Sequence, residues 1–175
     1  NDLALSTEYY VKIDASAFDD SSGNSYAGIT DATSLSFTTV DAVAPTLSSS
    51  TPADNATAVI EGSNIVLNFS EVVDVERGSI VIYKASNNSV VETIDVTSNQ
   101  VTGSGTSQIT INPTNDLDSL TEYYLKIDAT AFDDPSGNSY AGIHDATSLS
   151  FTTGDAVDPT LTSSNPADDA TAIAE

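Results

Sequence analysis

The sequence predicts an all-β protein built as a sandwich of two sheets. Helix signals are almost absent, whereas short runs of alternating apolar and polar residues recur along the chain, separated by clusters of Gly, Pro, Asn and Asp. Alternation with a period of two places one side of each strand in a core and the other side in water. Short strands at a spacing of roughly 8–15 residues, bounded by turn residues, are typical of sandwiches.

An internal repeat in the sequence also predicts how the chain is divided into domains. Residues 1–61 align with residues 115–175 at a constant offset of 114, and 47 of the 61 positions are identical. A period of this length is too long for a solenoid unit and matches one small domain. We therefore expect a tandem array, with 1–43 as the C-terminal part of a preceding module, 44–157 as a complete module and 158–175 as the N-terminal strand of a following module.

The first strands of the complete module follow from its apolar spacing. A strand is expected near 45–50, with a second short piece near 57–60. The strand 64–70 has a large apolar residue at every second position, and further strands are expected at 79–84 and 90–97. The alternating apolar residues of 64–70 are Ile65, Leu67 and Phe69.

Three later strands are expected at 107–112, 122–130 and 147–153. Their alternating apolar residues are Ile109, Ile111, Tyr123, Leu125, Ile127, Leu149 and Phe151. Seven strands in this order resemble an immunoglobulin-like sandwich. Tyr123 stands early in its strand, where a tyrosine corner belongs, although an ordinary place in the core would also explain this residue.

Short linkers join the expected modules. Residues 40–46 and 154–160 carry Pro45 and Pro159, each at the start of the first strand of a module. Proline fixes φ and removes a backbone donor, which suits a stiff entry into an edge strand. Short linkers of this kind limit bending between neighbours. The sequence therefore predicts a rod of modules rather than a flexible string.

Charge and composition exclude some classes of function and partner. The chain has 26 acidic and 4 basic side chains, a net charge of −22 and no Cys. Nucleic acid is excluded as a partner, because its phosphates would be repelled. No apolar run approaches the roughly 20 residues of a membrane-spanning helix, so we expect no membrane insertion. So acidic a surface suits either bound divalent cations or a solvated coat.

Four sequence motifs carry a family resemblance. These are PTLTSSNPADDATAI from Pro159, NIVLNFSE from Asn64, AFDDPSGNSYAGI from Ala131 and the closing SFTT from Ser150. Together they resemble the bacterial Ig-like repeat domains of S-layer proteins and giant repetitive extracellular adhesins. The resemblance implies an extracellular, non-catalytic module that acts as a spacer, a surface-coat element or an adhesive unit. Some related adhesin repeats depend on calcium at their junctions.

Acidic side chains from three segments are expected to converge at one end of the complete module. In a seven-stranded sandwich this end holds the loop after 64–70, the loop after 122–130 and the incoming linker. Ca²⁺ takes about six to eight oxygen ligands. The candidate metal ligands there are Asp41, Glu71, Asp74, Glu76, Asp133, Asp134, Asn138 and Asp145. Related candidates are Asp19 and Asp20 in the first copy, and Asp155 and Asp158 in the outgoing linker.

An ordinary acidic turn would explain some of these residues equally well. The run DDPSGN places Gly137 where a positive φ costs little, and Asp or Asn side chains bind their own backbone in such turns. The D-x-D-x-D-G spacing of an EF-hand is missing. Calcium and a bare acidic turn are therefore both open at this point.

No catalytic arrangement is supported. His144 is the only histidine, and Thr30 occupies its place in the first copy. Without Cys or a repeated His, a nucleophilic triad has no basis. Adjacent Asp133 and Asp134 would point to opposite faces of an extended strand, which argues against a glycosidase pair. We expect no enzyme; the alternatives to a structural module are an enzyme-accessory domain and a carbohydrate-binding module that uses Tyr26 and Tyr140.

Neighbouring copies are the expected partners. The segments 1–43 and 158–175 each supply only part of a sandwich and would expose apolar faces. We expect them to be completed by another copy, through strand exchange or head-to-tail continuation; the alternative is that they rest on the complete module. A head-to-tail contact that does not close builds a filament.

Overall fold

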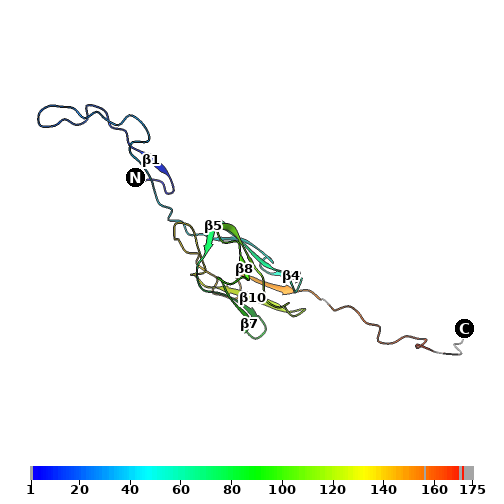
Figure 1. Cartoon of the computed structure of the whole chain (residues 1–175). Coiled ribbons are helices and arrows are strands. Elements are labelled where there is room, and N and C mark those ends of the chain that lie inside the picture. The colour runs from blue at the N-terminus through cyan, green and yellow to red at the C-terminus, as the bar shows by residue number, and fades with distance from the viewer. Residues whose placement is uncertain (1, 156, 170, 172–175) are drawn as a thin grey trace.

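Ten of the twelve described strands, β3 to β12, lie in a central sandwich with an extended segment at each end. The computed structural model describes residues 2–155, 157–169 and 171, which form strands but no helix, and hence no helix that could cross a membrane (Figure 1). The strands are β1 (Glu8–Tyr10), β2 (Ser36–Thr38), β3 (Leu47–Thr51), β4 (Ala56–Val59), β5 (Ile65–Val75), β6 (Ser79–Lys84), β7 (Ser89–Asp95), β8 (Val101–Thr102), β9 (Thr106–Ile111), β10 (Glu122–Ile127), β11 (Phe132–Asp133) and β12 (Ser150–Thr153).

Two sheets form the sandwich. One has the strand order β4-β12-β10-β6-β7, and the other has the order β11-β5-β9-β8, with β3 also paired to β5. The chain changes sheets early, because β3 pairs antiparallel with β5 whereas β4 pairs in parallel with β12. This architecture confirms the all-β, immunoglobulin-like sandwich that the sequence predicts.

The core fills the space between the sheets with the alternating residues of both. Leu67 of β5 and Ile109 of β9 face Ile82 of β6 and Leu125 of β10, and all four are 0% exposed. Full burial of one such side chain contributes about 1.5–3 kcal/mol. The apolar residues named from the period-two spacing are thus all buried, and Tyr124 on the opposite side of β10 is buried as well.

Tyr123 forms a tyrosine corner. Its hydroxyl accepts a hydrogen bond of 2.8 Å from the backbone N–H of Asp118, five residues upstream, and its ring is 1% exposed. The bond ties the turn before β10 to the start of that strand. The corner role is therefore confirmed over that of an ordinary core residue.

The sheet edges depend on pairings that the sequence did not predict. The strand expected at 90–97 is β7, and it pairs with β6, because a tight turn returns the chain directly along β6. The turn is closed by a hydrogen bond from Asn88 N–H to the Lys84 carbonyl. The short strands β8 and β11, two residues each, were not expected.

Strand ends differ from the predicted ranges for local reasons. β5 continues to Val75 because β11 pairs with its far end, opposite Asp74 and Val75. Glu71 and Asp74 therefore lie in a strand and not in the loop that the sequence suggested. β12 begins only at Ser150, because the Asp145 carboxylate accepts the backbone N–H groups of the residues expected to open the strand.

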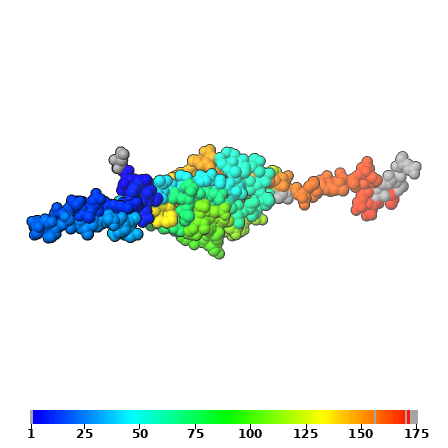
Figure 2. Space-filling model, turned by 90° about the horizontal axis from the view of Figure 1, so that it is seen from above, coloured from blue at the N-terminus to red at the C-terminus, as the bar shows by residue number. Residues whose placement is uncertain are grey.

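The terminal segments leave the sandwich at opposite ends. Figure 2 shows the N-terminal segment extending from one end and the C-terminal segment from the other. The N-terminal segment contains only the antiparallel pair β1–β2. Residues 157–169 form no strand, and Leu161 is 85% exposed.

Candidate metal site

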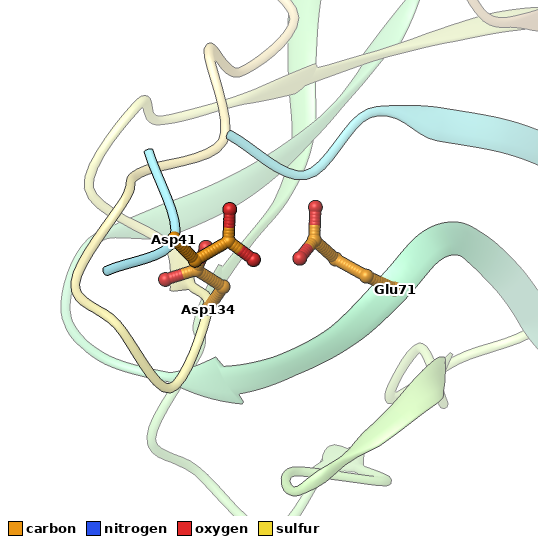
Figure 3. Close-up of side chains that lie close together, drawn as sticks. All are labelled: Asp41, Glu71 and Asp134. Atoms are coloured by element: carbon orange, nitrogen blue, oxygen red, sulfur yellow. The ribbon is translucent and has the colours of Figure 1, made fainter. Parts of the chain in front are cut away.

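Three carboxylates meet where the incoming linker joins the sandwich. Asp41 comes from the linker, Glu71 from β5 and Asp134 from the loop after β11, and one oxygen of each lies within 4.8 Å of the others. Figure 3 shows Glu71 reaching from β5 toward the other two carboxylates. Segments nearly 100 residues apart in the chain thus supply one cluster of oxygen atoms.

The turn after β11 fixes Asp134. Its Oδ1 accepts backbone N–H bonds of 2.8 Å from Ser136 and Asn138, and its Oδ2 accepts a 2.8 Å bond from the Asn138 amide. Gly137 takes the positive φ of +86° that closes the turn. The Asp134 side chain, 4% exposed overall, is therefore held in one orientation by its own loop.

The linker is fixed by the same turn. The Asn138 amide also donates a 3.3 Å bond to the Asp41 carbonyl, and Asp41 Oδ1 accepts the backbone N–H of Val43 at 3.0 Å. Farther along, Thr46 and Ser70 exchange two bonds, one through the Ser70 hydroxyl and one through the Thr46 carbonyl. Asp41 consequently stays beside the sandwich although it belongs to no strand.

Electrostatics at the cluster are unfavourable without a cation. Burial and the nearby charges of Asp41 and Asp134 raise the pKa of the Glu71 carboxyl. Burial also raises the pKa of Asp134, but hydrogen bonds from Asn138 and from the backbone of the turn outweigh it and hold that pKa below its ordinary value. Among the described residues the ion pair Lys84–Asp118 is the only one, so no lysine or arginine neutralises the cluster.

The donor set fits a hard divalent cation. Its atoms are carboxylate oxygens, with neither imidazole nor thiolate, which suits Ca²⁺ or Mg²⁺ rather than zinc or copper. Three carboxylates can offer up to six oxygen atoms, and water can complete the shell of a calcium ion. A cation here would relieve the repulsion that raises the Glu71 pKa.

Other candidate ligands of the same module lie outside this cluster. Asp74 and Asp133 face each other in the β5–β11 pair, and one oxygen of Asp133 is buried without a hydrogen-bond partner among the described residues. Glu76 is exposed and lines a separate hollow with Asp133. Asn138 acts through its amide N–H groups, as a support for Asp134 and the linker. Asp145 is exposed and accepts four hydrogen bonds from its own turn, which hold its pKa low.

The remaining candidates belong to the terminal segments. Asp20 holds the same turn as Asp134, through bonds from Ser22 and Asn24, but it has no counterpart of Glu71 beside it among the described residues. Asp19 is exposed next to it. Asp155, the counterpart of Asp41, and Asp158 are exposed in the outgoing segment. Among the residues that the structure describes, none of these four joins a cluster of three acids.

Tyr140 and His144, considered above for glycan binding and for catalysis, have ordinary structural roles in the module. Tyr140, expected as part of a glycan platform, is only 6% exposed and packs edge-on against Phe69, with ring centroids 5.2 Å apart. It therefore offers no platform in the complete module. His144 is exposed and its Nε2 lies 2.9 Å from the Ala141 carbonyl, which fits an ordinary loop residue.

The sequence did not predict which of the candidate acids form the cluster. All three clustered acids were among the candidates, but nothing in the sequence separated them from Asp74, Glu76 or Asp145. The distinguishing signal is the hydrogen-bonding pattern of the loop, in which Asn138 couples Asp134 to the linker. The asparagine four residues after an aspartate was the one sequence sign of that coupling.

The chain belongs to a family of bacterial Ig-like domains. The family model described as "Bacterial Ig-like domain" matches residues 41–153, the linker aspartate and the whole sandwich. Domains of this family are generally non-catalytic. A search of curated proteins found no match.

Two solved structures are similar to the chain. CopC from Methylosinus trichosporium OB3b has 12% identity and a TM-score of 0.46, with 66% of this chain and 99% of CopC covered. The S-layer protein rSbsC(31-844) has 16% identity and a TM-score of 0.42, with 66% of this chain and 14% of that protein covered. These likenesses are too weak to carry an argument about function.

Proposed function

We propose that the chain is a structural module of an extracellular bacterial tandem-repeat protein, such as an adhesin stalk, a surface filament or a surface coat. Its modules follow one another head to tail, and calcium stabilises their junctions. The observation that carries the proposal is the carboxylate cluster, because one of its three members, Asp41, lies in the linker between modules.

A bound cation at this place would act on the joint between modules. Asp41 is the fifth residue before the start of the paired backbone at Thr46, and Glu71 and Asp134 belong to the sandwich. A cation held by all three would tie the linker to the module that follows it. Bending at the linker would then require loss of a ligand, which makes a stiff rod.

The acidic surface and the repeat support the same proposal. A net charge of −22 over 175 residues keeps copies apart and soluble. Near-identity of the copies is expected where one unit is reused to gain length. Charge and repetition thus support the proposal of a load-carrying unit with an ion-dependent joint.

Thermal unfolding with and without calcium tests the proposal. A ligand that binds only the folded state adds about 2.7 kcal/mol at about 100 times its Kd, or roughly 10 °C in Tm for a domain of this size. We expect Glu71→Gln to abolish most of this rise, because Gln supplies one neutral oxygen in place of a carboxylate. Glu122→Gln, an exposed acid on β10 away from the cluster, is the matched control.

The effect of ionic strength on Tm must be distinguished from the effect of calcium binding at the cluster. Sodium chloride matched to the calcium solution screens the whole acidic surface without filling a specific site. An equal rise in Tm with sodium chloride, or an unchanged response in Glu71→Gln, would leave only a solvated acidic coat. Small-angle scattering of a two-module chain, with calcium and with chelator, reports whether the joint stiffens.

A further inference from the structure

The sandwich carries its two linkers at opposite ends. The chain enters at Thr46, runs through β3 and β4, passes through β5 to β11, and leaves along β12 at Gly154. Figure 2 shows the segments before and after the sandwich extending from opposite ends. A pull along the chain therefore draws β3 and β4 toward one end and β12 toward the other.

The strands β4 and β12 connect these two loaded points directly. They are neighbours in one sheet and run parallel, with Phe151 opposite Ala56 and Thr153 opposite Val59. Because β4 is loaded through the residues before it and β12 through the residues after it, the two strands are pulled in opposite directions. The bonds of a parallel pair are evenly spaced, so they share a load along the strands, whereas a pair that is peeled from one end opens one bond at a time.

Hydrogen bonds close the β4–β12 pair at both of its ends. Before β4, the backbone N–H of Asn55 donates to the Ser150 carbonyl at 2.7 Å, and Asp54 Oδ1 accepts the backbone N–H of Ser150 at 2.9 Å. At the other end, the backbone N–H of Gly154 donates to the Val59 carbonyl at 2.8 Å. The two strands therefore cannot slide past each other without breaking bonds at both ends of the pair.

The point at which a load leaves the sandwich is bonded to a second element. The Gly154 carbonyl accepts the backbone N–H of Leu120 at 2.9 Å and the Ser119 hydroxyl at 2.8 Å, and both donors belong to the turn before β10. In β12 itself, Phe151 and Thr153 are 2% and 1% exposed. Water therefore has little access to replace a bond that breaks.

The point at which a load enters is held in a similar way. Thr46 donates its backbone N–H to the Ser70 hydroxyl at 3.0 Å and accepts the Ser70 N–H at 2.9 Å. From there β3 runs antiparallel to β5, which belongs to the other sheet. A pull at Thr46 draws β3 along β5 and not away from it, so the β3–β5 pair is also sheared.

We propose that the β4–β12 pair is a mechanical clamp, which makes the sandwich resist unfolding more strongly along the chain than across the strands. The β3–β5 pair carries the load before it reaches β4, and the bonds at Gly154 hold β12 where the load leaves. The inference rests on the proposed function, because only a module with chain on both sides of it carries such a load.

Single-molecule pulling in two directions tests the proposal. The chain has no Cys, so introduced cysteines define the two points of attachment. Val40→Cys with Val157→Cys, both at exposed linker positions, applies the force along the chain. Val40→Cys with His144→Cys applies it between two points on the incoming side, because the neighbouring Ile143 pairs with the last residue of β10.

The force needed to unfold the sandwich should depend on direction. With chelator present, we expect it to be about two-fold higher or more along the chain, because forced unfolding is governed by the unfolding rate and the sheared bonds must break together. Equal forces in the two directions overturn the proposal.

Substitution of Gly154 supplies a matched control. Gly154→Pro removes the N–H that bonds to Val59, whereas Gly154→Ala keeps it, and a Cβ there comes no closer than 3.5 Å to Ala58. We expect Gly154→Pro to lower the force along the chain and to leave the force between residues 40 and 144 unchanged, and Gly154→Ala to change neither. An unchanged force along the chain in Gly154→Pro, or an equal loss in both directions, overturns the assignment to β4–β12.

The outcome is independent of the calcium experiment. The force is measured with chelator, and the clamp is formed by residues 54–59 and 150–154, which do not include Asp41, Glu71 or Asp134. A normal calcium-dependent rise in Tm with equal forces in both directions removes the clamp alone. A direction-dependent force without a calcium response removes the ion-dependent joint alone.

Discussion

Residues 2–39 and 116–153 share 31 of 38 amino acids, but large apolar side chains that are exposed in the first segment are buried in the second. Phe18 is 62% exposed and Phe132 is 0% exposed, although the same backbone bond to a tyrosine eight residues later fixes both. The difference separates two contributions to the fold. Local sequence shapes this segment, and the strands of 47–111 provide nearly all of its burial.

The local contribution is visible in details that need no partner strand. Gly28 and Gly142 take φ values of +82° and +79°, and a Cβ on either would lie 2.6 Å or less from a backbone oxygen. Asp31 and Asp145 each accept the N–H groups of the residues two and three positions later. Glycine and aspartate at these positions therefore determine the turns in both copies.

The non-local contribution is visible in strand length. β10 has six residues and pairs with both β6 and β12, whereas β1 has three and pairs only with β2 among the described residues. Strand pairing on two sides extends the regular backbone. This comparison predicts that equal substitutions in the two copies have unequal effects.

The largest contrast is expected between Phe132 and its counterpart Phe18. Phe132→Ala should lower the free energy of unfolding by about 3–5 kcal/mol, because it leaves a cavity beside Phe69. Phe18→Ala should change it by less than about 0.5 kcal/mol, because the side chain is exposed. Urea unfolding followed by circular dichroism measures both; similar losses in the two variants would contradict the comparison.

Much of this fold could be predicted from sequence because it depends on period-two spacing. Ile65, Leu67 and Phe69 are buried as their alternation predicts, and Tyr123 makes the corner bond. The edges could not be predicted. The pairing of β7 with β6 depends on a turn at 85–88, and the length of β5 depends on β11, more than 50 residues away.

The candidate site, like the fold, could be predicted from the sequence only in part. Aspartates in loops and the linker could be recognised as oxygen donors, and topology indicated which end of the sandwich they share. Which three meet could not be predicted, because it depends on the exit angle of the linker and on the amide of Asn138. Glu71 itself was placed in a loop, and it reaches the cluster from a strand.

The second contrast concerns calcium. Asp134 and Asp20 hold the same turn, but Asp134 alone has Asp41 and Glu71 beside it. We expect Asp134→Asn to remove most of the roughly 10 °C rise in Tm at calcium about 100 times its Kd, and Asp20→Asn to leave the rise unchanged. Loss of the response in Asp20→Asn would place the ion in the N-terminal segment instead.

The third contrast concerns the corner hydroxyl. Tyr123→Phe leaves the half-buried N–H of Asp118 without its acceptor and should cost about 1–2 kcal/mol. Tyr9→Phe removes the equivalent bond from Ala4, where water can replace it, so the urea midpoint should not move. A matched loss in Tyr9→Phe would mean that the N-terminal segment unfolds together with the module.

The smallest effect is a change in pH dependence at Glu71. Burial and the charges of Asp41 and Asp134 raise its pKa above the ordinary value of 4.5, so the folded module binds more protons than the unfolded chain just above that pH. The stability that this provides is complete below pH 4.5 and is lost as the pH rises through the raised pKa.

Glu71→Gln should therefore flatten the fall in Tm as the pH rises above 4.5, measured with chelator present so that no calcium neutralises the cluster. Glu122→Gln on β10 should keep the wild-type slope, because it lies away from Asp41 and Asp134. The sign of the change in Tm at neutral pH distinguishes repulsion at Glu71 from stabilisation of Glu71 by favourable bonds. If Glu71 were held by favourable bonds, its removal would lower Tm most at neutral pH, whereas repulsion predicts that Glu71→Gln without calcium is at least as stable there as the wild type.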